Sequence, residues 1–212
     1  MKLTDLYMAV TCILEEQYTS RAGFALSPGD VVLDIGGHIG SFAVYAAQRA
    51  ARVIVYEPDA SSHAQLLKNL AANGLINVTA RQEAVAGRSG SRPIYPARLN
   101  SAENNFYWGG PRGTAVSCVT LEEAFRAHGL ERCDFLKIDC EGAEYEILRA
   151  APADVLARVR RIGIEAHVGR FFGIDDPSAV PATLLDLLRR AGFETEHWVE
   201  NDLHTFIWAR RA

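Results

Sequence analysis

The stretch Val31-Val32-Leu33-Asp34-Ile35-Gly36-Gly37-His38-Ile39-Gly40 decides the fold of this chain. A run of apolar residues reaches an acidic residue, breaks into glycines and leads directly into a helical pattern. This order predicts a buried parallel strand whose carboxyl end turns tightly into a helix. Such turns bind ligands, because glycine lets a ligand approach the backbone and the start of a helix offers unpaired N–H groups.

The glycine spacing helps to decide which ligand the turn binds. A dinucleotide-binding turn has glycines in the order G-x-G-x-x-G. Gly37 and Gly40 fit the last two positions, but Ile35 occupies the place of the first. Asp34 adds a negative charge, which is unfavourable beside a pyrophosphate and favourable beside an amine or a sulfonium. The turn therefore favours a cationic nucleotide-type ligand, and an NAD-dependent oxidoreductase or epimerase is the alternative.

Length and charge set further bounds. We expect the 212 residues to form one domain, residues 1–212, and the net charge of −4 argues against a nucleic-acid partner. The four cysteines form no C-x-x-C pair, and no apolar run is long enough for a membrane span. The N-terminus lacks the layout of a signal peptide. These features are typical of a soluble cytoplasmic protein, and we expect no membrane partner.

Strand and helix patterns alternate along the chain, which predicts an α/β fold with a mostly parallel sheet and helices on both faces. Strands are expected at 31–35, 52–56, 78–85, 135–139 and 162–166, and helices at 41–49, 60–72 and 181–191. Two further strands, 193–199 and 205–210, are joined by so few residues that they must form an antiparallel hairpin. A parallel sheet that ends in such a hairpin is the outline of the seven-stranded, Rossmann-like class I methyltransferase sheet.

Two segments stand outside this alternation. Residues 1–28 are expected to form a helical cap on the domain, because apolar residues recur there at helical spacing. Residues 97–115 are rich in Asn, Gly and aromatic residues and show no period, so they are either a substrate loop or a surface excursion. Either segment could serve as a dimer interface, and the oligomeric state, possibly a homodimer, stays open.

Carboxylates follow the second and third expected strands. Glu57 comes seventeen residues after Gly40, near the position where a carboxylate binds both ribose hydroxyls of a nucleotide. The neighbouring Pro58 and Asp59 are also good residues for the start of a helix. Glu83 could approach an adenine ring or could be a surface carboxylate.

Seven motifs together resemble the FkbM family of S-adenosylmethionine-dependent methyltransferases. They run in order from about Val31 to His167: DIGGHIG, YEPDA, LLKNLAANG, EAVAG, TLEEAF, DFLKIDCEGAEYEIL and RIGIEAH. Cys140 replaces an aliphatic residue that the family often has there. The resemblance implies a class I fold, methyl transfer that is usually to an oxygen of a small molecule, and cofactor contacts at Asp34, Gly36, Gly40 and Glu57.

The expected cofactor is therefore S-adenosylmethionine, and the expected partner is a small-molecule acceptor such as a sugar or a natural-product intermediate. His38 lies inside the glycine turn, so it is expected to face the cofactor or the acceptor. The residues that we predict to bind the cofactor are Asp34, Gly36, Gly37, His38, Gly40, Glu57, Pro58, Glu83 and Ala84.

A hydroxyl acceptor needs a general base or a metal ion, because it is a poor nucleophile until it loses its proton. If the strands at 135–139 and 162–166 are adjacent and in register, Lys137 pairs with Glu165 in the interior, and Asp139 meets His167 at the carboxyl edge. Our hypothesis is that His167, oriented by Asp139, takes the acceptor's proton. A purely structural histidine is the alternative. A metal ion on Asp139, Glu141, Glu165 and His167 is possible but is not predicted.

Overall fold

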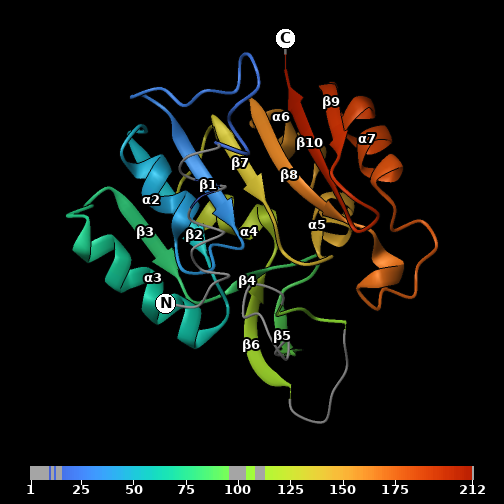
Figure 1. Ribbon diagram of the computed structural model, residues 1–212, viewed down its shortest axis with the longest axis horizontal. Coiled ribbons are helices and arrows are strands. Elements are labelled where there is room, and N and C mark those ends of the chain that lie inside the picture. Colours follow the sequence, from blue (N-terminus) through green and yellow to red (C-terminus); the bar gives the residue numbers. More distant parts are fainter. Residues whose placement is uncertain (1–9, 11, 13–15, 96–103, 108–112, 212) are drawn as a thin grey trace.

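A seven-stranded sheet forms the centre of the structure, a computed structural model that describes residues 10, 12, 16–95, 104–107 and 113–211 (Figure 1). The strand order is β3-β2-β1-β7-β8-β10-β9, and β10 runs antiparallel to both of its neighbours. The sheet and its C-terminal hairpin confirm the predicted class I architecture. Its strands are β1 (Val31–Ile35), β2 (Arg52–Tyr56), β3 (Val78–Arg81), β7 (Phe135–Ile138), β8 (Arg161–His167), β9 (Glu194–Val199) and β10 (His204–Arg210).

Helices cover both faces of this sheet, because its central strands are apolar on both sides. Val32 and Phe135 face the layer of α2 and α3, whereas Leu33 and Leu136 face the layer of α4 to α7. Among the described residues, no helix has both the length and the apolar character that a membrane span requires. The helices are α2 (Ser41–Ala47), α3 (Ala60–Ala72), α4 (Leu121–Ala127), α5 (Glu144–Ala150), α6 (Ala153–Ala157) and α7 (Pro181–Arg190), with a 3-10 turn, η3, at Gly169–Phe171.

A second, three-stranded sheet lies beyond the carboxyl ends of the parallel strands (Figure 1). Its order is β4-β6-β5, from β4 (Ala84–Val85), β5 (Gly90–Ile94) and β6 (Thr114–Val119). The prediction of one strand over 78–85 is therefore wrong, because the chain leaves the large sheet after Arg81. Ala84 then pairs with Cys118 and joins a separate buried cluster. Arg81, Gln82 and Glu83 interrupt the apolar residues at the break, but this interruption does not show that the partner strands change.

The two segments outside the strand-helix alternation are described only in part: residues 10, 12 and 16–28 of the first, and residues 104–107 and 113–115 of the second. Residues 16–28 consist of turns and irregular chain. Tyr18 and Phe24 are buried there in the layer of α2, and the Trp208 ring N–H donates to the Tyr18 carbonyl at 3.1 Å. This segment therefore packs on the sheet through single aromatic side chains.

Candidate active site

The glycine turn after β1 packs tightly between the carboxyl ends of the neighbouring strands β2 and β7. The N–H groups of Gly36 and Gly37 both donate to the carbonyl of Tyr56, at 3.1 and 3.0 Å. Gly36 has a positive φ of 82°, and a Cβ at this position would lie 1.7 Å from the carbonyl oxygen of Asp139. Only glycine fits there. The turn that we predicted to bind the cofactor is thus in direct contact with the chain that carries the candidate catalytic carboxylate.

Glu57 lies against this turn, where its carboxylate is buried and accepts two backbone hydrogen bonds. One oxygen accepts from His38 N–H and the other from Asp59 N–H, each at 2.8 Å. Burial raises the pKa of Glu57 to about 7, although the two backbone donors act to lower it. Asp59 caps α3 by accepting from Ser62 N–H at 2.8 Å, which agrees with a helix-start role for Asp59. Pro58 lies between Glu57 and Asp59 in the sequence.

Glu83 and Ala84 lie where the chain crosses from the large sheet to the small one. The Glu83 carboxylate forms an ion pair with Arg81 at 2.8 Å, with its side chain 21% exposed. Ala84 is buried in β4. Contact of these two residues with an adenine ring stays a prediction.

A buried lysine joins the cofactor turn to the end of β7. The ammonium of Lys137 lies 3.2 Å from Asp34 Oδ1 and 3.4 Å from Asp139 Oδ2, and it donates to the Gly36 carbonyl at 2.6 Å. Burial acts to lower the pKa of Lys137, but Asp34 and Asp139 raise it well above its ordinary value, so this side chain stays charged. The ammonium thus connects the glycine turn after β1 with the carboxyl end of β7.

The register of β7 and β8 places Lys137 beside Gly163. The prediction of a Lys137–Glu165 pair is therefore wrong by two residues. The same shift brings Glu165 level with Asp139, and the hydroxyl of Tyr18 lies between them. It is 2.9 Å from Asp139 Oδ2 and 3.1 Å from Glu165 Oε2. No sequence signal marked Tyr18, because both of its partners are more than a hundred residues away along the chain.

His167 is oriented by Glu144. The imidazole is 1% exposed, and its Nδ1 lies 2.9 Å from Glu144 Oε1, while its Nε2 lies 3.5 Å from Glu141 Oε2. The expectation that Asp139 orients the ring is thus corrected. Glu144 is also the first residue of α5, where an acid is favourable in itself. Burial acts to lower the pKa of His167, but Glu141 and Glu144 raise it well above its ordinary value, which favours the protonated ring.

Further side chains gather around His167 at the carboxyl edge of β7 and β8. The potential ligand atoms of Asp139, Glu141 and His167 all lie within 4.8 Å of one another, and the same holds for Glu165, His167 and His204. Asp139 and His167 therefore do come together. Glu165 and His204 join them, although the sequence did not mark His204.

The described part of the predicted substrate loop borders this cluster. Residues 104–107 and 113–115 are described, and Asn105 pairs with Tyr95 through backbone hydrogen bonds. Thr114 and Ala115 belong to β6, so the expected loop is too long at its C-terminal end. A Cβ on Gly142, the residue after Glu141, would lie 3.3 Å from the ring of Tyr107. Tyr107 is thus one wall of the region next to the carboxylates.

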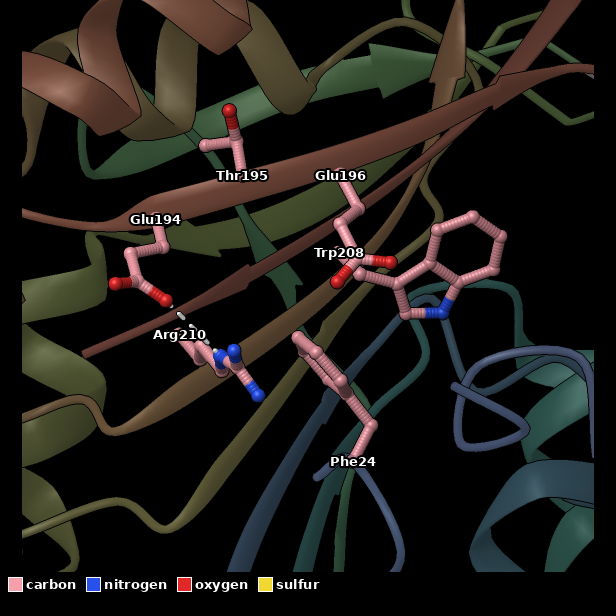
Figure 2. A pocket seen from close by; sticks show the side chains of 6 residues that line it. All are labelled: Phe24, Glu194, Thr195, Glu196, Trp208 and Arg210. Atoms are coloured by element: carbon pink, nitrogen blue, oxygen red, sulfur yellow. Dashed lines mark hydrogen bonds and ion pairs between the residues drawn. The ribbon is translucent and has the colours of Figure 1, made fainter. Parts of the chain in front are cut away.

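A shallow pocket of about 180 Å³ lies at the other end of the C-terminal hairpin (Figure 2). Arg210 forms an ion pair with Glu194 there, and the register of β10 places Arg210 opposite Arg161 at the amino end of β8. Sheets of this kind bind their ligands at the carboxyl ends of the strands, so this pocket is not the cofactor site. It is lined by Phe24, Glu194, Thr195, Glu196, Trp208 and Arg210.

Comparison with known proteins identifies the family. The sequence profile of the methyltransferase FkbM domain matches residues 34–195, from the glycine turn to the start of β9. The chain belongs to the FkbM methyltransferase family. It is an S-adenosylmethionine-dependent methyltransferase with a class I fold, and the alternative of an NAD-dependent oxidoreductase is not favoured.

Two curated relatives and one solved structure illustrate the match. The chain is 33% identical, over 89% of its length, to the AMB antimetabolite synthetase AmbE of Pseudomonas aeruginosa, but it spans only 10% of that protein. It is 26% identical to the methyltransferase sdnD of Sordaria araneosa, over 85% of this chain and 81% of that one. A putative methyltransferase from Streptococcus mutans in complex with S-adenosylhomocysteine shares the fold, with a TM-score of 0.53, 8% identity and coverage of 99% and 98%.

The tight packing of the glycine turn predicts that a methyl group at Gly36 destabilises the fold strongly. We expect Gly36→Ala to lower the free energy of unfolding by about 2–5 kcal/mol, because it adds a clash with Asp139 to the cost of a positive φ. Gly129→Ala is the matched control: Gly129 has a φ of 61° but open space around its Cβ position. It should cost only about 1 kcal/mol. Equal losses of the free energy of unfolding in urea titrations of the two variants would show that Gly36 is not tightly packed against Asp139.

The position of Lys137 predicts that its charge is essential to the fold. Lys137→Met leaves Asp34 buried without its cation, so we expect a loss of about 3–5 kcal/mol in the free energy of unfolding. The exposed Lys68→Met on α3 should change it by less than about 0.5 kcal/mol. The double variant Asp34→Asn/Lys137→Met should lose clearly less than the sum of the single losses. Additive losses in the same urea titrations would show that the two residues do not interact.

Proposed function

We propose that this protein transfers a methyl group from S-adenosylmethionine to a hydroxyl oxygen of a small molecule, such as a sugar or a natural-product intermediate. The observation that carries the proposal is the cluster of carboxylates around His167, at the sheet edge that touches the glycine turn. A hydroxyl must lose its proton to become a good nucleophile, and such a cluster offers groups that handle protons.

The proposed cofactor half of the site fits S-adenosylmethionine. When bound, this molecule supplies the methyl group on a sulfonium. Each carboxylate oxygen of Glu57 accepts one backbone hydrogen bond and keeps a second lone pair, so both could also accept from ribose hydroxyls. Gly36 is partly exposed and has no side chain, so a ligand could come close to the backbone of the turn at this residue. The proposed cofactor residues are Asp34, Gly36, Gly37, His38, Gly40, Glu57, Pro58, Glu83 and Ala84.

In the proposed acceptor half, Asp139 and His167 lie against the reacting hydroxyl. Burial acts to raise the pKa of Asp139, but Lys137 and His167 lower it below its ordinary value, so this carboxylate is ionised. His167 carries a proton in the free protein and can act as a base only after it loses that proton. Lys137 also fixes Asp139 relative to the Gly36 carbonyl, which suits a reaction that depends on in-line positioning of two substrates.

The acceptor class and the surroundings of the site are part of the same proposal. AmbE is named as an antimetabolite synthetase, which supports a natural product as the acceptor. Residues 97–115 are proposed as a substrate loop, because Tyr107 borders the acceptor side.

We place the activity in the cytoplasm within one domain, residues 1–212, capped by residues 1–28. No nucleic-acid substrate is proposed, and a homodimer is compatible with the site.

Cofactor identity has a direct test. S-adenosylhomocysteine should raise the melting temperature of the protein, and NAD should not. Because the pKa of Glu57 is about 7 and the ionised carboxylate is the better ribose acceptor, affinity for S-adenosylhomocysteine should be about tenfold higher at pH 8 than at pH 6. In Glu57→Gln this rise should vanish. Stabilisation by NAD alone, or the same pH slope in the variant, would refute the proposed cofactor site.

The acceptor atom can be tested with matched compounds. We expect that a screen of hydroxylated sugars and natural-product intermediates with S-adenosylmethionine will yield S-adenosylhomocysteine and a methyl ether. The deoxy analogue of any hit should be inert. Asp139→Asn should lower kcat by about 100-fold or more, because it removes a charge beside the reacting oxygen, while binding of S-adenosylhomocysteine is kept. Methylation at nitrogen or carbon, identified by NMR of the product, would overturn the O-methyl assignment.

A further inference from the structure

We propose that Asp139, Glu141 and the Nε2 atom of His167 bind a divalent metal ion at the carboxyl edge of β7 and β8. The ion would hold the oxygen of the acceptor next to the glycine turn, and His167 would then position the ion instead of taking the acceptor's proton. Its presence is inferred from the geometry of the three side chains, and only its role in catalysis rests on the proposed function.

The spacing of Glu141 and His167 fits a single ion, and Asp139 lies next to both. Their potential ligand atoms lie within 4.8 Å of one another, and Glu141 Oε2 is 3.5 Å from His167 Nε2. Two ligand atoms that are each about 2.1 Å from one ion are about 3–3.6 Å apart. Glu141 Oε2 is buried and receives no hydrogen bond from the described residues. This oxygen can therefore bind an ion in place of the imidazole proton that faces it.

Glu144 prepares the imidazole for this task. It is fully buried, and its Oε1 lies 2.9 Å from His167 Nδ1 and also accepts from Cys140 N–H at 3.0 Å. With the Nδ1 proton held by Glu144, the lone pair of a neutral ring is on Nε2, which faces Glu141. A carboxylate behind the second ring nitrogen is the usual arrangement of a metal-binding histidine.

The balance of charge also favours a cation. The carboxylates of Asp34, Asp139, Glu141, Glu144 and Glu165 all lie in this region and are mostly shielded from water. Among the described side chains that they contact, Lys137 is the one permanently charged cation. Buried carboxylates need compensating charge, and a divalent ion would supply two further positive charges.

The second group of possible ligands, Glu165, His167 and His204, fits an ion less well. His204 Nδ1 is shared between Glu200 and Glu165 at 3.7 and 4.0 Å, whereas the two ring nitrogens of His167 face Glu144 and Glu141. Two carboxylates and one imidazole suit a first-row ion such as Mn²⁺. Three protein ligands would leave coordination positions for water and for the acceptor oxygen.

The test is a titration of the metal-free, full-length protein with MnCl₂, in which electron paramagnetic resonance measures free Mn²⁺. We expect one Mn²⁺ per chain. Glu141→Gln should weaken binding at least tenfold, and Glu144→Gln by about 10–100-fold through loss of ring orientation. The matched controls Glu165→Gln and His204→Gln should bind Mn²⁺ like the unmodified protein. His167 is 1% exposed and the Glu141 side chain is 12% exposed, so Glu141→Gln disturbs the fold less than His167→Gln and is the deciding variant.

Stabilisation by S-adenosylhomocysteine serves as the folding check for each variant. Absence of stoichiometric Mn²⁺ binding, or unchanged binding in Glu141→Gln, would overturn the inference. Loss of binding in the two control variants but not in Glu141→Gln would also overturn it, because the ion would then lie on the other group. Full methyl transfer by the chelated protein would remove the catalytic role of the ion and leave the proposed function standing. Failure of S-adenosylhomocysteine to bind would count against the proposed function alone.

Discussion

The ammonium of Lys137 is the contact on which the rest of the site depends. It neutralises Asp34 inside the sheet, binds the Gly36 carbonyl of the cofactor turn and pairs with Asp139 at the acceptor edge. A charge of this kind is costly to bury, so each of its partners must be held in place by the fold. The close approach of Gly36 to the Asp139 backbone adds a steric constraint in the same direction. The two halves of the site are therefore built as one rigid unit.

Much of this arrangement could be predicted from sequence, because the information is local. The apolar run that ends in Asp34 and glycines gives a strand and a turn, and the short link at 200–204 forces an antiparallel hairpin. The break after Arg81 could not be predicted. Only two residues separate 78–81 from 84–85, and only tertiary pairing shows that the two pieces belong to different sheets.

The candidate site was predictable in composition but not in pairing. The alternation of side chains along each strand, together with the positions of Asp139 and His167 at the strand ends, was enough to place both residues at the same edge of the sheet. The register between β7 and β8 could not be read, because strands buried on both faces carry no alternation that fixes their alignment. A shift of two residues exchanges Glu165 for Gly163 beside Lys137 and puts Tyr18 between two acids. The pairing of Glu144 with His167 was not predictable either, because Glu144 begins α5 and no local pattern links it to β8.

The hydroxyl of Tyr18 has one hydrogen and faces two carboxylates. It can donate to only one of them at a time, so the other oxygen must be satisfied by a proton of its own or by a different donor. Lys137 lowers the pKa of Asp139, whereas burial and the charge of Asp139 raise the pKa of Glu165 to about 8, so Glu165 is the carboxyl of the pair that takes up a proton first. Because the shared hydrogen belongs to a residue near the start of the chain, the N-terminal segment helps to set how many protons the acceptor edge holds at the moment when a substrate arrives.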